Sequence, residues 1–224
     1  MSEEEKNYVF KNCLLGLPGS DESFTAEQIL AALQTYKGID RQQLKQNLFS
    51  FLRAVVPVAE ANGLQMAIHP DDPPYSVLGL PRIVSNEEDL ADIVNCVNSS
   101  ANGLCFCTGS LGARPDNDIV GMIDKFADRI HFLHLRNTKR LPNGNFFEAD
   151  HLDGDTDMYE VMKKVVQLMR RRNVSIPMRP DHGHQMLDDL QKTTYPGYSA
   201  IGRLKGLAEL RGLELGVTRS IVHF

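Results

Sequence analysis

The chain has 224 residues, of which 42% are hydrophobic and 24% are charged, so it can bury the core of one domain or of two small ones. A formal net charge of -5 and a pI near 5.8 exclude the basic excess that nucleic-acid-binding proteins usually show. No apolar stretch reaches the ~18 residues of a membrane span, and residues 1–6 lack the apolar core of a signal peptide.

Two smaller features of the composition indicate a reduced, cytoplasmic protein. Four cysteines are too sparse for a disulfide framework and are expected to be free thiols: Cys13, Cys96, Cys105 and Cys107. The one basic cluster, residues 170–172, consists of three arginines. We interpret it as the solvated last turn of a helix, where cations interact favourably with the helix dipole.

The first 63 residues are predicted to be helical. Thr25 begins a capping box for a helix that runs to Gly38, and Asp40 can cap a longer helix that ends near Gly63. Apolar residues recur in the longer helix at three- and four-residue spacing, as one buried face requires. Pro57 is expected to kink this helix.

From residue 64 onward, short apolar strands alternate with helices. The strands are expected over 64–68, 104–107, 129–135 and 174–178, and the helices over 85–99, 117–128, 157–172 and 198–213, with a polar loop after the third strand. This alternation is typical of βαβ units with parallel strands. Right-handed crossovers would place the C-terminal ends of all the strands on one side.

Four potential metal ligands stand at these strand ends: His69, Cys107, His134 and Asp181. Each is separated from the next by about one βα unit, so parallel pairing would gather them where α/β proteins place their sites. Two imidazoles and a carboxylate suit manganese or iron(II), and a thiolate shifts the preference toward iron(II) or zinc. Each residue alone has a structural interpretation, but the four together predict a metal site.

The neighbours of these ligands divide into structural and functional candidates. Cys105 lies deeper on the same strand face and is interpreted as a buried core residue. His131 should point to the opposite strand face from His134 and is interpreted as structural. Arg136 fits two roles equally well, a forked contact with a substrate carboxylate or an ion pair with a loop carboxylate.

The segment that follows Asp181 adds proton-transfer chemistry. His182 lies beside a candidate ligand and can transfer protons near neutral pH. Gly183 permits unusual backbone angles or the close approach of a ligand. His184 is a candidate for substrate binding.

Seven motifs resemble those of the mannonate dehydratase family, and the similarity runs from about Leu14 to about Leu215. They occupy 69–74, 79–83, 107–110, 134–136, 151–155, 177–189 and 196–206. The most specific is Pro177-Met-Arg-Pro-Asp-His-Gly-His-Gln-Met-Leu-Asp-Asp189.

The resemblance implies a (β/α)8 TIM-barrel enzyme of hexuronate (glucuronate) catabolism. Such an enzyme converts D-mannonate to 2-dehydro-3-deoxy-D-gluconate and uses Mn²⁺ or Fe²⁺. The resemblance assigns the metal to the four ligands named above. It assigns the acid and base roles to His182 and Tyr198 without dividing them, and Tyr198 enters by resemblance alone.

The chain has four predicted strands where the family fold needs eight. We therefore expect a single domain with a helical segment (1–63) followed by the second half of a TIM barrel (64–224). A half-barrel has two unpaired sheet edges, which favours a homo-oligomer. Besides a dehydratase acting on a small sugar acid, the alternatives are an inactive fragment that binds metal or self-associates, and a metal-dependent sugar isomerase.

Overall fold

The computed structural model describes residues 2–14, 24–195 and 197–221, and leaves the side chains of residues 9 and 11–14 outside the description. The thiol of Cys13 therefore lies outside the described residues. The other three thiols, Cys96, Cys105 and Cys107, are free, as their number predicted. In the described part of the chain, no helix combines the length and apolar character that crossing a membrane requires.

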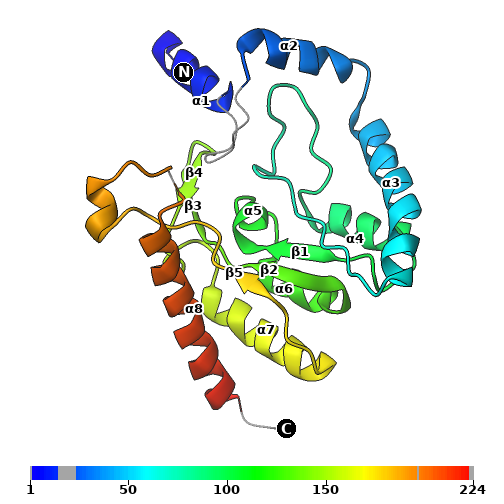
Figure 1. Cartoon of the computed structure of the whole chain (residues 1–224), viewed down its shortest axis with the longest axis vertical. Coiled ribbons are helices and arrows are strands. Elements are labelled where there is room, and N and C mark those ends of the chain that lie inside the picture. The colour runs from blue at the N-terminus through cyan, green and yellow to red at the C-terminus, as the bar shows by residue number, and fades with distance from the viewer. Residues whose placement is uncertain (1, 15–23, 196, 222–224) are drawn as a thin grey trace.

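A parallel sheet forms the centre of the fold. Its strands are β1 (Leu104–Cys107), β2 (Ile130–His134) and β5 (Met178–Arg179), in the spatial order β1-β2-β5. Both strand pairs are parallel, and the register places Cys107 opposite His134. The predicted alternation of strands and helices with parallel pairing is therefore confirmed (Figure 1).

The first predicted strand, over 64–68, is wrong in extent. Residues 66–68 run beside β1 in the predicted direction but form a single parallel bridge, at Ile68. The Ile68 N–H donates to the Gly103 carbonyl at 2.9 Å, and the Cys105 N–H donates to the Ile68 carbonyl at 2.9 Å.

The last predicted strand, over 174–178, is also too long, because only Met178 and Arg179 pair with β2. Within the described residues, this strand and segment 66–68 each pair on one side only. A segment with one neighbour has half the ladder hydrogen bonds of an inner strand, so fewer hydrogen bonds hold its ends in regular strand geometry.

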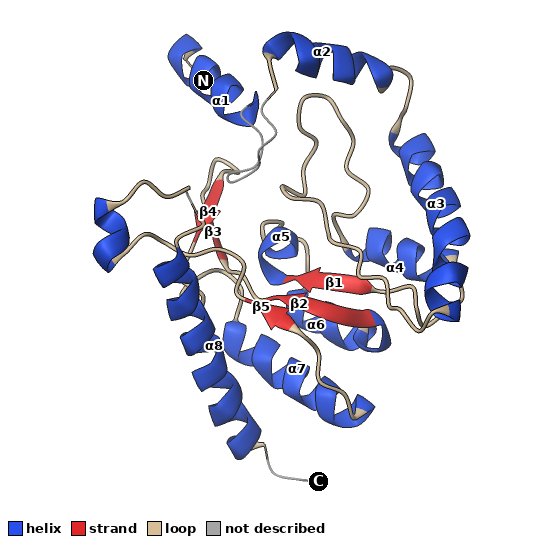
Figure 2. Ribbon diagram, viewed as in Figure 1, coloured by secondary structure: helices blue, strands red, loops and turns tan. Residues whose placement is uncertain are grey.

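Helices pack along the sheet on one face. They are α4 (Glu87–Cys96), α6 (Ile119–Lys125), α7 (Met158–Arg172) and α8 (Ala200–Ser220). Figure 2 shows α6 and α7 under the strands, with α8 beside α7. Their apolar sides and the helix-facing side of the strands form one buried core, which includes Leu90, Ile93, Phe106, Met122, Ile130, Leu133, Val161, Val165 and Leu210.

The expected helix boundaries need three corrections. The helix predicted over 85–99 is shorter, and its N-cap is Asn86, whose side chain accepts from the Asp89 N–H. The helix predicted over 117–128 ends early and continues as a 3-10 turn, η1 (Ala127–Arg129). The tail helix extends beyond residue 213 to Ser220.

Four short elements lie where loops were expected. They are α5 (Thr108–Gly112), β3 (Thr138–Arg140), β4 (Phe146–Glu148) and the 3-10 turn η2 (Leu187–Gln191). Strands β3 and β4 pair antiparallel as a hairpin. The prediction of a polar loop after the third strand is therefore wrong, and this hairpin contributes to the site described below.

The N-terminal segment is helical, as predicted, in α1 (Glu3–Leu14), α2 (Ala26–Thr35) and α3 (Arg41–Ala61). The capping box at Thr25 is present, and the Asp40 side chain accepts from the Gln43 N–H at 2.8 Å. Helix α3 continues through Pro57 for another turn. Helix α2 buries none of its side chains, and Figure 1 shows α1 and α2 away from the sheet.

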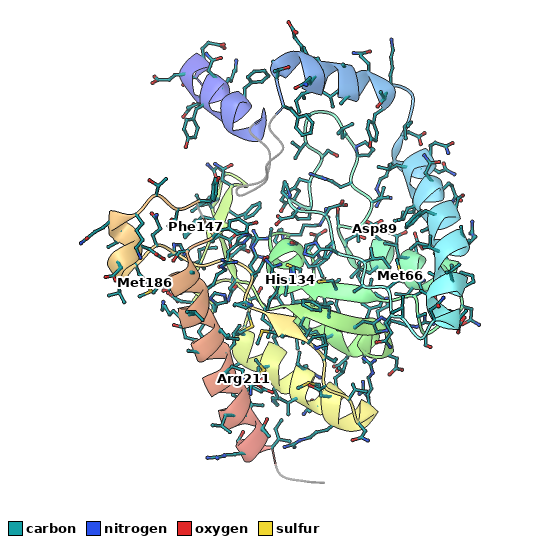
Figure 3. All side chains as sticks on the ribbon, viewed as in Figure 1. Met66, Asp89, His134, Phe147, Met186 and Arg211 are labelled. Atoms are coloured by element: carbon teal, nitrogen blue, oxygen red, sulfur yellow. The ribbon has the colours of Figure 1, made fainter. Side chains whose placement is uncertain are left out.

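A buried carboxylate attaches α3 to α4. Asp89, labelled in Figure 3, has no exposed surface and accepts from Arg41, from the Lys45 Nζ at 2.8 Å and from the Ser85 N–H at 3.1 Å. Two cations and a backbone amide offset the desolvation of this charge. Asp92 binds the same Lys45 Nζ at 2.8 Å but is 44% exposed.

The basic cluster at the end of α7 is not simply solvated. Arg172 donates to the carbonyls of Ala127 and Ile130, each at 2.8 Å, and Arg170 donates to the Thr218 carbonyl at 2.6 Å. These bonds satisfy carbonyls at the ends of other elements. The cluster does occupy the last turn of a helix, as predicted, but two of its three arginines join α7 to its neighbours.

Removing the charge of Asp89 should destabilise the fold. We expect Asp89→Asn to lower the free energy of unfolding by about 3 kcal/mol, because it leaves Arg41 and Lys45 without their buried partner. Asp92→Asn is the matched control and should cost less than about 1 kcal/mol, as exposed pairs do. Urea unfolding followed by circular dichroism measures both, and equal losses would contradict the assignment.

Candidate metal centre

The four predicted ligands converge at the C-terminal ends of the strands. The ligand atoms of Cys107, His134 and Asp181 lie within 4.8 Å of one another. His69 joins them through its Nε2, which is 3.0 Å from the Nδ1 of His134. Figure 3 shows His134 near the centre of this end of the sheet. The parallel register of β1 and β2 is what brings residues so distant in sequence together.

The four do not form one compact group. His69 and His134 instead lie within 4.8 Å of a different thiol, that of Cys105, which makes a second group sharing His134 with the first. Cys105 is buried, as expected, but it faces the ligands. The site therefore holds two overlapping sets of three ligand atoms.

Local contacts orient the ligands. The His69 Nδ1 lies 2.6 Å from the Pro70 carbonyl, and since a carbonyl only accepts, Nδ1 carries the proton and Nε2 is unprotonated, as a metal ligand must be. The Cys107 sulfur accepts from the Ser110 N–H at 3.4 Å and from its hydroxyl at 3.2 Å. Such outer contacts fix the direction in which a ligand presents its lone pair.

Asp181 has a left-handed backbone with φ of 67°, which only glycine, asparagine and aspartate adopt readily. Asp181 lies two residues after Arg179, the last residue of β5. The Arg179 Nη2 donates to one carboxylate oxygen of Asp181 at 2.9 Å. The other oxygen lies 3.6 Å from the His134 Nδ1.

This donor set fits a divalent transition metal. Metal–ligand bonds of roughly 2.1 Å separate neighbouring ligand atoms by about 3.0–3.4 Å, and the His69 and His134 nitrogens already have this spacing. Thiolate, imidazole and carboxylate together match borderline metals better than magnesium or calcium.

The close contact between Gly183 and Gly202 positions the two proton-transfer candidates. A Cβ atom on Gly183 would lie 2.3 Å from the Arg203 nitrogen, and one on Gly202 would lie 2.1 Å from the His184 carbonyl. The backbones therefore cross with no room for side chains. Of the two roles predicted for Gly183, the structure supports close approach, here of the backbone of α8 rather than of a ligand.

This crossing places His182 against Tyr198. Their ring centroids are 5.0 Å apart at an interplanar angle of 85°, an edge-to-face contact. The His182 Nδ1 lies 3.8 Å from the Asp181 carboxylate. The two proton-transfer candidates and the candidate metal ligands thus occupy one site.

Glu148, at the end of β4, is a member of the site that the sequence analysis missed. It binds the Arg136 Nε with both carboxylate oxygens, at 2.8 and 2.9 Å, and Arg136 also binds Asp72. Burial raises the pKa of Glu148, but contacts with His182 and Arg136 outweigh it and lower that pKa to about 2. Arg136 is only 4% exposed, so its guanidinium here serves the second of its two expected roles, the ion pair.

One oxygen of Glu148 lies 3.2 Å from the His182 Nδ1. The distance is within hydrogen-bonding range, but the two groups do not meet the geometry of a hydrogen bond, so Nδ1 is buried without a partner. Glu148 thus connects Arg136 to His182.

His184 is exposed and lines a cavity of about 450 Å³ beside these residues. Glu148 and Gly183 line the same cavity, together with Lys139 and Lys205. His131 lies apart, with its Nδ1 2.8 Å from the Met66 carbonyl, and its burial lowers its pKa. It is therefore structural, as predicted.

The sequence does contain an indication of the hairpin that carries Glu148. Asn143-Gly144 is a typical hairpin turn, and Gly144 has a positive φ of 85°. The flanking strands have three residues each, too few for alternation of polar and apolar residues to mark them. Cys105 had no such signal, because an inward-facing buried thiol looks the same in sequence as a core residue.

Comparison with known proteins points to one family. The family model described as D-mannonate dehydratase (UxuA) matches residues 1–223. The mannonate dehydratase of Marinomonas sp. (strain MWYL1) is 49% identical over 227 aligned residues, which cover 99% of this chain and 58% of the relative. The mannonate dehydratase of Saccharophagus degradans (strain 2-40) is 50% identical over 220 aligned residues, which cover 95% of this chain and 55% of the relative. The chain spans about half the length of the curated relatives it matches.

Solved structures agree on the fold. The mannonate dehydratase of Streptococcus suis serotype 2 superposes with a TM-score of 0.77 at 36% identity, over 92% of this chain and 56% of that one. A xylose isomerase domain protein from Planctomyces limnophilus gives a TM-score of 0.53 at 14% identity, over 79% and 54%, which shows similarity of fold alone. The expected α/β fold of the TIM-barrel type, here with a partial sheet, is confirmed.

Asp181→Asn should abolish metal binding. Asparagine tolerates the left-handed backbone at this position, so the change removes the charge with little strain. We expect the affinity for Mn²⁺ to fall by more than about 100-fold, since even partners outside the ligand set are worth 10–100-fold. Titration calorimetry measures the affinity, with the exposed Asp188→Asn as control. Unchanged affinity in Asp181→Asn would refute its role as ligand.

Proposed function

The chain belongs to the D-mannonate dehydratase family, and on this premise we propose that it carries the metal-binding and proton-transfer groups for dehydration of D-mannonate to 2-dehydro-3-deoxy-D-gluconate, in hexuronate catabolism. The observation that carries the proposal is the convergence of His69, Cys107, His134 and Asp181 beside His182 and Tyr198. We propose Mn²⁺ or Fe²⁺ as the metal and the cytoplasm as the location.

The reaction needs a base for the C2 proton and an acid for the departing C3 hydroxyl. Bound at these ligands, a divalent metal supplies Lewis-acid polarisation of the substrate carboxylate or adjacent hydroxyl, which acidifies the C2 proton. His182 and Tyr198 lie close enough to serve one substrate from the same side, and we assign them the two proton transfers. Their geometry does not divide the two roles.

Glu148 is suited to position His182. Its low pKa keeps it ionised, so it can only accept, and Nδ1 of the ring must then carry the proton. This tautomer leaves the Nε2 of His182 with a free lone pair, as a base requires. Arg136 holds Glu148 in place through hydrogen bonds from its Nε and its Nη2.

Arg136 and His184 are our candidates for substrate binding. Arg136 binds Glu148 along one edge of its guanidinium, while Asp72, 34% exposed, binds its Nη1. A substrate carboxylate could replace Asp72 without disturbing Glu148. His184 lines the cavity that adjoins the site, and this cavity has room for a six-carbon sugar acid.

We propose that the active species is a homo-oligomer, because segment 66–68 and β5 each leave one edge unpaired among the described residues and unpaired edges favour self-association. Incubation of the purified chain with D-mannonate and Mn²⁺ or Fe²⁺ should yield the keto-deoxy acid, identified by mass spectrometry. Light scattering on the active fraction should give a mass above that of one 25.1 kDa chain. A folded, metal-loaded chain that yields only an isomer, or no product, would contradict the proposal.

His182→Asn and Tyr198→Phe should each lower kcat by about 10²–10⁴-fold, because each removes one of the two proposed proton-transfer groups.

Glu148→Gln should impair turnover more than binding. A glutamine can offer its NH₂ group to the ring, so the imidazole loses its fixed tautomer. We expect kcat to fall by about 10- to 100-fold, the range of groups that orient a catalytic side chain, with KM within about threefold. Glu160→Gln, which removes an exposed pair with Lys163, is the control and should change neither. A rise in KM alone would contradict the positioning role.

A further inference from the structure

The motif His151-Leu-Asp-Gly-Asp155 supplies none of the groups that the proposed reaction uses, yet its first side chain is buried. The His151 Nε2 lies 2.7 Å from the carbonyl oxygen of Pro180, the residue before Asp181. Since a carbonyl only accepts, Nε2 carries the proton and donates it. A loop that follows β4 is thereby bonded to the segment that carries a candidate metal ligand.

We propose that His151 is a positioning residue, which holds the backbone of Asp181 in the conformation that presents its carboxylate to a metal. It rests on the proposed function in that Asp181 is taken as a ligand. His151 itself touches neither the metal nor the substrate in this role.

The backbone of Asp181 needs such a support. Its φ of 67° lies in the left-handed region, which is unfavourable for a residue with a side chain and persists where the surroundings hold it. The Pro180 carbonyl and the Asp181 N–H belong to one planar peptide unit. A hydrogen bond to this carbonyl therefore fixes the plane, and with it the direction in which the Asp181 side chain leaves the backbone.

The His151 ring is itself confined by α8. A Cβ atom on Gly206 would lie 2.1 Å from the Cε1 of His151 and 2.7 Å from its Nε2, so the ring packs directly on the helix backbone. Only 6% of His151 is exposed. Gly206 thus provides the space in which the ring reaches the Pro180 carbonyl.

Asn137 attaches the His151 backbone to the end of β2. Its Nδ2 donates to the His151 carbonyl at 3.1 Å and to the Thr156 carbonyl at 2.9 Å. Its Oδ1 accepts from the N–H groups of Thr138 and Thr156, both at 3.1 Å. Asn137 is 1% exposed, so these bonds are shielded from water.

These contacts connect two strands that carry or precede ligands. A backbone bond from the Leu135 N–H to the Arg179 carbonyl, at 3.1 Å, joins the ends of β2 and β5. Farther along the two segments, Asn137 and His151 bridge the gap to Pro180 through side chains. The bridge therefore sets Asp181 relative to the strand on which His134 stands.

Removing the donor of His151 should weaken metal binding. We expect His151→Leu, which fills the space without an N–H, to lower the affinity for Mn²⁺ by about 10–100-fold, as loss of a group that orients a ligand does. His151→Gln keeps an N–H at the end of its side chain and should stay within about threefold of the unaltered chain. The matched control is His131→Leu, which removes another buried histidine 2.8 Å from a carbonyl and should leave the affinity unchanged.

Two glycines of α8 give an independent pair of variants. Gly206→Ala and Gly212→Ala both favour the helix, but only the first places a methyl group against the His151 ring, since nothing lies within 4 Å of a Cβ at Gly212. We expect Gly206→Ala to lower the Mn²⁺ affinity by about tenfold and Gly212→Ala to leave it unchanged. Titration calorimetry measures all of these affinities, and circular dichroism checks the folding of each variant.

Amide exchange in the metal-free chain tests the positioning role without any metal. The Gly183 N–H, two residues after Asp181, donates to the Gly197 carbonyl at 2.9 Å. We expect His151→Leu and Gly206→Ala to speed its exchange, read by NMR, by about tenfold or more, since the supporting bond to Pro180 is lost. His151→Gln, His131→Leu and Gly212→Ala should leave this exchange unchanged.

Three results would overturn the proposal: unchanged Gly183 exchange or Mn²⁺ affinity in His151→Leu, equal losses in His131→Leu, or a loss in His151→Gln as large as that in His151→Leu. If His151→Leu does not fold, Gly206→Ala measured against Gly212→Ala decides by the same criteria. Failure of the unaltered chain to bind Mn²⁺ would contradict the proposed function instead. The Gly183 exchange rates would then decide the role of His151 by themselves.

Discussion

Parallel pairing of β1 with β2 is the constraint on which the rest of the site depends. Its register sets Cys107 opposite His134, and segment 66–68 and β5 extend the same direction on either side. Because parallel strands end on the same side, ligands far apart in sequence meet without any contact dedicated to bringing them together. The buried core beneath β1 and β2 fixes this register, since a one-residue slip would turn Phe106 and Leu133 out of the core.

Much of this arrangement could be read from the sequence. The alternation of short apolar strands with amphipathic helices predicted the parallel sheet, and the positions of His69, Cys107, His134 and Asp181 at strand ends predicted their convergence. Helix caps such as Thr25 and Asp40 were readable because one side chain and one backbone amide decide them. These features depend on spacing within one element or on a topological rule.

Other features could not be read, because they depend on partners that the sequence does not bring together. The strands over 64–68 and 174–178 are shorter than expected and, among the described residues, each pairs on one side only, which no property of their own residues encodes. The sequence left two roles for Arg136 equally open, because its ion-pair partner Glu148 lies on a hairpin that the sequence analysis did not predict. Tyr198 entered by resemblance alone, since its place beside His182 depends on the crossing of Gly183 and Gly202.

That crossing also gives α8 a mechanical role. At the first turn of α8, the Gly202 backbone is in direct contact with the backbone of Gly183, the residue after His182. At the other end of α8, Arg170 of α7 donates to the Thr218 and Ile221 carbonyls. A helix of 21 residues held at both ends behaves as a rigid rod about 30 Å long. The packing of α7 at one end of α8 and the segment that carries His182 at the other are therefore joined by one continuous helix.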